Sequence, residues 1–210
     1  MSERETLIDS AGALGVTLTA AQAESALALL DELERWSRSF NLTAITERRA
    51  MITHHLLDSL SVAPWIQGRR VLDVGTGAGF PGLPLAIAMP ATEFTLLDSN
   101  GKKVRFVAHV ARELALANVT AVHARAESIE PPPGGYDVVV ARACAPLAEL
   151  ISLVTPACGA TTRVLAMKGR RQVEERAGLP AGWAIEADPT LVIPGLDEER
   201  HLVVLRPPVS

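Results

Sequence analysis

Residues 71–82 read Val71-Leu72-Asp73-Val74-Gly75-Thr76-Gly77-Ala78-Gly79-Phe80-Pro81-Gly82. An apolar strand that carries an acid is followed by three alternating glycines and then by the start of a helix. Glycines let the backbone turn tightly and approach a ligand with no Cβ in the way, and a helix start offers free N–H groups. The stretch predicts a cradle for a nucleotide cofactor; the alternative is a glycine-rich turn that only closes a strand.

The spacing of Gly75, Gly77 and Gly79 indicates which cofactor the cradle would take. Gly-x-Gly-x-Gly is one residue tighter than the Gly-x-Gly-x-x-Gly of dinucleotide sites, and the acid, Asp73, precedes the glycines. This pattern favours S-adenosylmethionine (SAM) over a pyrophosphate.

Composition limits the remaining possibilities. A chain of 210 residues with 48% hydrophobic content fits one α/β domain with an elaboration. The charged start leads into no apolar block, and no apolar run approaches the roughly 18 residues of a membrane span. We therefore expect a cytoplasmic protein without a membrane contact, and a monomer. Cys144 and Cys158 form no zinc pattern, so no metal site is expected. A net charge of −4 argues against nonspecific coating of nucleic acid, so any RNA contact must be local.

The pattern of elements changes near residue 67. Residues 1–66 read as an N-terminal helical extension packed on the core, with one helix over about 20–38 behind the N-cap Thr19 and another from about Thr46. Residues 67–210 alternate strand and helix signals, which calls for a parallel sheet. We expect strands over 71–74, 93–98, 119–123, 136–141 and 163–167, and helices over 82–88, 101–116, 147–155 and 172–177.

Two later strands, over 183–192 and 200–206, are separated by the turn-rich residues 194–198. So short a connection requires an antiparallel pair. The predicted fold is therefore α/β: a Rossmann-like, mostly parallel sheet with an antiparallel C-terminal strand pair, as in class I SAM-dependent methyltransferases.

Ligands of such sheets bind at the carboxyl ends of the strands, so the residues that follow each strand are the site candidates. Asp98 ends the second strand about 20 residues beyond the glycines, where a carboxylate accepts bonds from ribose hydroxyls; a helix N-cap is its alternative. Ala126 and Glu127 follow the third strand, where an amide and a carboxylate could meet adenine. Arg142 follows the fourth strand, where exocyclic-amine methyltransferases carry Asn-Pro-Pro-Tyr. Cys144 lacks the preceding proline of C5-methylating enzymes, so we expect no covalent role for it.

Several ordered blocks of the sequence resemble the ribosomal RNA small subunit methyltransferase G family. The resemblance rests on six of them: Asn41 through Ile45, His55-x-x-Asp58-Ser59-Leu60, Asp73 through Pro84, Leu96-Leu97-Asp98-Ser99-x-x-Lys102-Lys103, Tyr136 through Pro146, and Met167-Lys168-Gly169. It implies methyl transfer from SAM to N7 of one guanosine in the decoding-region loop of 16S rRNA, free or in the small ribosomal subunit. It also implies cofactor contacts at Gly75, Phe80, Ala126, Glu127 and Arg142.

Guanine N7 has an in-plane lone pair and no proton, so its methylation needs alignment rather than a general base. Alignment can contribute about 7 to 11 kcal/mol. We expect Arg142 and Lys168 to position the base by donating to guanine O6, although ion pairs with Asp98 or Glu127 and phosphate contacts are alternatives for them. Phe80 and Arg142 could hold the unstacked base by their planes.

Two other functions fit the sequence in part. A nicotinamide-dependent oxidoreductase can use a similar sheet, and a non-catalytic ribosome-binding factor could keep the cofactor as a structural ligand. The sequence leaves open whether His54 and His55 meet RNA phosphate or pack, and whether Asn41 and Thr43 line the site.

Overall fold

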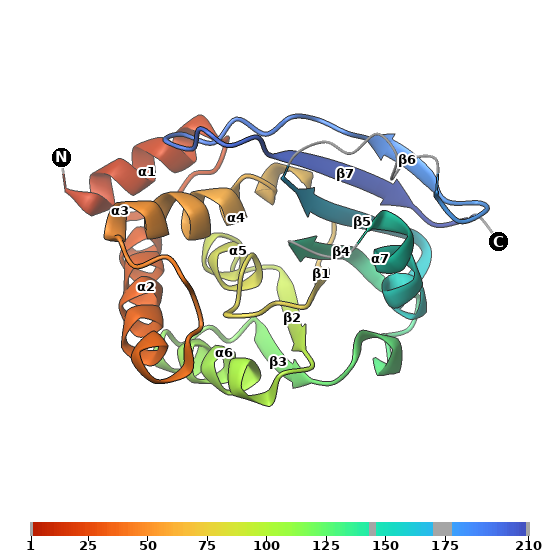
Figure 1. The fold of residues 1–210 in the computed structure, drawn as a ribbon, viewed down its shortest axis with the longest axis horizontal. Helices are drawn as coiled ribbons and strands as arrows, with labels where there is room; N and C mark the ends of the chain where they lie inside the picture. The colour runs from red at the N-terminus through yellow and green to blue at the C-terminus, as the bar shows by residue number, and fades with distance from the viewer. Residues whose placement is uncertain (1, 143–145, 170–177, 209–210) are drawn as a thin grey trace.

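A computed structural model describes residues 2–142, 146–169 and 178–208 of the chain. The expected helix over 172–177 and Cys144 lie outside these residues. Within them, one sheet crosses the molecule and helices cover both of its faces (Figure 1).

The sheet has seven strands in the order β3-β2-β1-β4-β5-β7-β6. Strands β1 to β5 are parallel, while β7 is antiparallel to both of its neighbours, β5 and β6. The bounds are β1 Arg70–Val74, β2 Glu93–Asp98, β3 Val119–His123, β4 Tyr136–Arg142, β5 Cys158–Lys168, β6 Ala184–Ala187 and β7 His201–Arg206. The central strands are apolar on both faces because helices cover both of them. The predicted mostly parallel sheet with an antiparallel C-terminal pair is confirmed.

Three helices follow strands and cover the sheet: α5 Gly82–Ala88, α6 Gly101–Glu113 and α7 Leu147–Val154. Successive residues of β1 serve opposite faces, as a strand requires: Val71 belongs to the hydrophobic cluster shared with α5 and α6, and Leu72 to the cluster shared with α7.

The N-terminal helices pack on one face of the sheet. They are α1 Glu3–Ala13, α2 Ala20–Phe40, α3 Arg48–Met51, a π-helical segment Ile52–Leu57, and α4 Asp58–Leu60; short 3₁₀ turns occupy Ala63–Trp65, Ala126–Ser128 and Thr155–Ala157. Thr19 caps α2 as predicted, and Asn41 ends the helix in the left-handed conformation, φ 48°.

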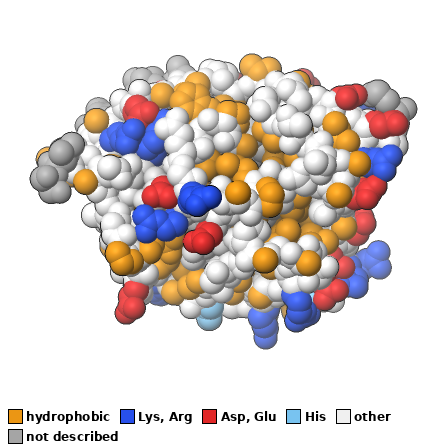
Figure 2. Space-filling model, turned by 180° about the vertical axis from the view of Figure 1, so that it is seen from behind, with side chains coloured by type: hydrophobic (Ala, Val, Ile, Leu, Met, Phe, Trp, Pro, Cys, Tyr) orange, Lys and Arg blue, Asp and Glu red, His pale blue; other side chains and the backbone are white. Residues whose placement is uncertain are grey.

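One hydrophobic cluster joins these helices to the sheet. Leu29, Leu30 and Leu33 of α2 share it with Phe94, Leu96 and Phe106. Phe40, the last residue of α2, is 42% exposed. On the reverse face of the molecule, hydrophobic side chains form a broad band among charged ones (Figure 2).

The C-terminal segment differs from its prediction. Strand β6 ends at Ala187 rather than at 192, and residues 188–200 form a loop. A bridge between Thr190 and His201, the Leu191 N–H bond to the Arg200 carbonyl and the Asp188–His201 pair tie this loop to β7. Pro189 and Pro194 lack the N–H that a continued ladder would need. Strand β5 begins at Cys158, five residues before the expected start at Arg163. No helix in the described part of the chain is long and apolar enough to span a bilayer.

Candidate functional site

The glycine loop between β1 and α5 divides into an open half and a packed half. Gly75 and Gly77 have left-handed backbones, φ 68° and 61°, and a Cβ at either would meet no atom closer than 4.0 Å. A Cβ on Gly79 would lie 2.2 Å from Leu83 Cδ1, and one on Gly82 would lie 2.7 Å from Asp73 Oδ2. The first two glycines therefore leave free space at the strand end, while the last two let α5 approach β1 closely.

Asp73 holds this loop from beneath. Its Oδ2 accepts hydrogen bonds from Thr76 Oγ1 at 2.6 Å and from the Gly82 N–H at 2.8 Å. Burial raises the pKa of the Asp73 carboxyl to about 6, although the bonds from Thr76 and Gly82 oppose the shift. The second oxygen, Oδ1, is buried and has no partner among the described residues. Asp73 thus fixes the shape of the loop, although burying its carboxylate away from water is energetically unfavourable.

Asp98 lies against the open half of the same loop. Its Oδ2 accepts from the Gly77 N–H at 2.9 Å and its Oδ1 from the Asn100 N–H at 2.8 Å. Each carboxylate oxygen keeps further acceptor capacity. The structure thus brings together the glycines and the acid that the sequence proposed as one cofactor site, and the helix N-cap is Asn100 rather than Asp98. The free space and the acceptors fit the adenosine part of SAM.

Ala126 and Glu127 form a 3₁₀ turn soon after β3. Strand β3 pairs with β2 so that His123 is opposite Asp98, which places this turn at the same edge of the sheet. Glu127 is exposed and Ala126 is half-buried. Their contact with adenine stays a prediction.

Phe80 is enclosed by two other site residues. Its ring stacks on His55 with centroids 4.7 Å apart, and Arg142 Cζ lies 5.3 Å from the ring centroid. Because Phe80 is only 3% exposed, its ring offers no open face for an RNA base. Any contact of this residue with a cofactor would be made by its backbone. The stacking expected of Phe80 is therefore replaced by core packing.

His55 is a packed residue rather than a surface one. Its Nε2 lies 2.9 Å from Thr43 Oγ1, and its Nδ1 is buried without a partner in the described chain. Burial lowers the pKa of His55 to about 4, and the positive charges of Arg142 and His54 add to the effect. The neutral ring joins Thr43 to Phe80, so the segment after α2 is tied to the glycine loop.

Arg142 pairs with an acid that strand-end reasoning did not consider. Its Nη1 donates to Asp58 Oδ2 at 3.2 Å and to the His54 carbonyl at 3.0 Å. Arg200 Nε donates to the other oxygen of the same carboxylate, Oδ1, at 3.1 Å. The Asp58 side chain is 6% exposed, and those of Arg142 and Arg200 are 22% and 25% exposed. One buried carboxylate therefore holds two arginines. The alternative that Arg142 pairs with Asp98 or Glu127 is not observed among the described residues.

Three cations share one edge of the sheet. In the strand register, Arg142 of β4 is opposite Met167 of β5, and Lys168 of β5 is opposite His201 of β7. Because β7 is antiparallel, Arg200, which precedes its first residue, lies at the carboxyl ends of the parallel strands. The position of Arg200 could have been predicted from the sequence, because the first residue of an antiparallel strand over 200–206 lies at the carboxyl ends of the parallel strands.

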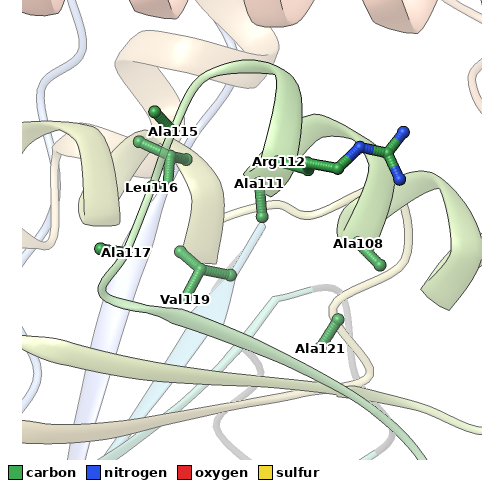
Figure 3. Close-up of a pocket in the computed structure, with 8 residues that line it drawn as sticks. All are labelled: Ala108, Ala111, Arg112, Ala115, Leu116, Ala117, Val119 and Ala121. Atoms are coloured by element: carbon green, nitrogen blue, oxygen red, sulfur yellow. The ribbon is translucent and has the colours of Figure 1, made fainter.

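A separate pocket of about 520 Å³ lies between α6 and β3 (Figure 3). Alanines line most of it, and Arg112 is its single charged residue. It carries no acid, nucleophile or base, so we assign no chemistry to it. Nor do the described residues contain a group of three side chains able to hold a metal ion.

A sheet in this strand order, with an open glycine loop after β1 and an acid at the end of β2, defines a Rossmann-like methyltransferase. The chain belongs, within that class, to the rRNA small subunit methyltransferase G family, whose family model matches residues 22–203.

Known proteins of the family are similar along nearly the whole chain. The ribosomal RNA small subunit methyltransferase G of Nitrosococcus oceani is 45% identical over 92% of this chain and 90% of its own. That of Marinobacter nauticus is 42% identical over 95% of this chain and 92% of its own.

Solved structures share the fold at low identity. Magnesium protoporphyrin IX methyltransferase from Synechocystis, with bound SAM, has a TM-score of 0.61 and 17% identity over 83% of this chain and 95% of that chain. A tRNA methyltransferase from B. subtilis has a TM-score of 0.58 and 13% identity over 71% of this chain and 65% of that chain. At these identities the likeness concerns the fold alone.

Proposed function

We propose that this protein uses SAM to methylate N7 of one guanosine in the decoding-region loop of 16S rRNA. The observation that carries the proposal is the open half of the glycine loop, with Asp98 bound to the Gly77 N–H and a three-cation edge of the sheet beside it. Membership of the family supports the coarser statement, an rRNA methyltransferase. The choice of N7 comes from what the resemblance to the family implies, and the chemistry of the site is compatible with it.

The residues that would hold SAM are Gly75, Gly77, Gly79, Phe80, Asp98, Ala126, Glu127 and Arg142. Gly75 and Gly77 give it room, and Asp98 would accept bonds from the ribose hydroxyls. When bound, SAM supplies an electrophilic methyl group on a positively charged sulfur.

The protein's own task is to place guanine. N7 has no proton to lose, and neither His55 nor Asp73, which are both buried beside the cradle, is placed to take a proton from guanine. His55 is enclosed, with its pKa lowered to about 4 by burial, and Asp73 lies beneath the loop, bonded to Thr76 and Gly82. Arg142 and Lys168 would donate to guanine O6 and leave N7 free, with Arg142 held by Asp58.

A single assay tests the proposal. Small ribosomal subunits and naked 16S rRNA, both lacking the modification, are incubated with the protein and labelled SAM, digested, and analysed by mass spectrometry. We expect N7-methylguanosine at one site; a labelled product methylated at another atom would reject N7 while leaving rRNA methylation intact. Comparing the two substrates shows which is used, and we propose that the protein acts on them as a cytoplasmic monomer.

The alternatives have their own signatures. An oxidoreductase would bind NAD and ignore S-adenosylhomocysteine in calorimetry, whereas the proposed enzyme does the reverse. A non-catalytic factor would bind subunits but transfer no methyl group, and Arg142→Ala would then have no activity to abolish.

A further inference from the structure

The C-terminal end of α2 and the N-terminal end of α6 form a surface, here called the α2–α6 rim, that carries positive charge without acidic partners. The last turn of α2 contributes Arg38 and the first turns of α6 contribute Lys102, Lys103 and Arg105. No ion pair or hydrogen bond engages these four side chains in the described parts of the chain. Figure 2 shows Lys and Arg side chains projecting together from the lower edge of the reverse face, where α6 lies.

Other arginines of the same two helices are paired with acids. Arg35, one turn before Arg38, pairs with Glu32, and Arg112, near the end of α6, pairs with Glu113 at 3.3 Å. Neutralisation by neighbouring acids is thus the pattern on this surface, and the rim departs from it. An uncompensated group of cations creates a local positive potential despite the net charge of −4.

An exposed aromatic ring stands among these cations. Phe40 is 42% exposed, and its ring lies 5.5 Å from Trp36, which in turn lies 5.5 Å from Phe106 of α6. Phe40 extends one turn beyond Trp36, and Lys102 and Lys103 lie one turn before Phe106. The ring and the two lysines are therefore neighbours at one end of the helix pair.

The rim adjoins the cofactor cradle. Asp98, which bonds to the Gly77 N–H, is only four residues from Lys102, so their Cα atoms are at most about 14 Å apart at full extension. On the other side, the segment that leaves Phe40 reaches Thr43, which bonds to His55 beside Phe80.

We propose that the α2–α6 rim, formed by Arg38, Phe40, Lys102, Lys103 and Arg105, docks the single-stranded RNA that flanks the target guanosine. Cations that track phosphates together with an aromatic ring that stacks a base are the combination by which proteins bind unpaired strands. The inference rests on the proposed function only in that RNA is the substrate. Phe40 takes the stacking role for which the enclosed Phe80 ring is unsuited.

Steady-state methyl transfer to small ribosomal subunits tests the rim, with co-sedimentation as a second measurement. Lys102→Glu places an acid near a helix N-terminus, which favours the helix, so lost binding cannot be ascribed to a weakened fold. We expect it to raise KM for subunits about tenfold, with kcat and the Kd for SAM within twofold, and to reduce the salt dependence of binding by about one phosphate contact. The matched control, Arg112→Glu, makes the same charge change on α6 and should alter KM less than twofold.

Variants of Phe40 provide an independent test of the rim. Phe40→Leu keeps an apolar side chain against Trp36 but removes the ring, so KM should rise while Phe40→Tyr restores it. Equal loss in Arg112→Glu would show a general charge effect and overturn the proposal, as would normal KM values in both rim variants. If the wild type methylates an atom other than N7, the KM comparison still decides the role of the rim, and if it binds without methylating, the co-sedimentation comparison does.

Discussion

Replacing Asp58 by Asn removes the single carboxylate that holds two arginines. Asp58 bonds to Arg142 at 3.2 Å and to Arg200 at 3.1 Å, and its side chain is 6% exposed. Removing one partner of a buried ion pair costs about 3–5 kcal/mol. The arginine side chains keep 22% and 25% exposure, which points to the lower limit, about 3 kcal/mol. The Asn amide could accept from one guanidinium, but its NH₂ would face the other.

The expected loss is large enough to measure directly. Urea unfolding followed by circular dichroism should show that the free energy of unfolding falls by about 3 kcal/mol. Tm should fall by about 6–12 °C for a domain of this size. The control is Glu24→Gln, because the Glu24–Arg4 pair is exposed, with side chains 60% and 46% accessible, and should cost less than about 1 kcal/mol. A loss in Asp58→Asn no greater than in this control would refute the idea that the carboxylate organises the cationic edge.

Three further variants test the loop and its surroundings. Gly77→Ala should lower the free energy of unfolding by about 1–2 kcal/mol because φ at this residue is 61°, and it should weaken SAM binding at least tenfold in calorimetry. The control Gly12→Ala, at an open helical position, should lower neither the stability nor the affinity for SAM. Because burial raises the pKa of Asp73 from 3.8 to about 6, the wild type should lose about 2 kcal/mol of stability relative to Asp73→Asn as pH rises from 4 to 7, and parallel pH curves would contradict this. The pKa of His55 is lowered from 6.5 to about 4, so its stability contribution is lost as pH falls through that window, by about 3 kcal/mol; in His55→Gln that loss should vanish from the unfolding curves.

The succession of strands and helices along the chain, and the mostly parallel sheet that it implies, were predictable because their signals are local. The glycine loop, the apolar runs of β1 and β4 and the alternation of strand and helix each require only a few neighbouring residues. Asp98 was predictable for the same reason, since its place at the carboxyl end of β2 follows from strand direction alone.

The partners of the site residues were not predictable in this way. Asp58 meets Arg142 and Arg200 only because the N-terminal helices pack on the sheet, and these contacts cross 84 and 142 positions of sequence. The burial of Phe80 depends likewise on His55, which the sequence left open between phosphate contact and packing. Tertiary packing, not local pattern, decides which cations are paired and which rings are exposed.

The number of residues in the π-helical segment Ile52–Leu57 determines where the site residues that it carries are placed. A π turn accommodates one residue more than an α turn, and here the segment carries His54 and His55 and leads directly to Asp58. Deleting a residue inside it would rotate α3 by about 100° relative to α4. The ring contact of His55 with Phe80 and the bonds of Asp58 to the arginines would no longer form together. Members of the family are therefore expected to keep the residue count constant between α3 and α4.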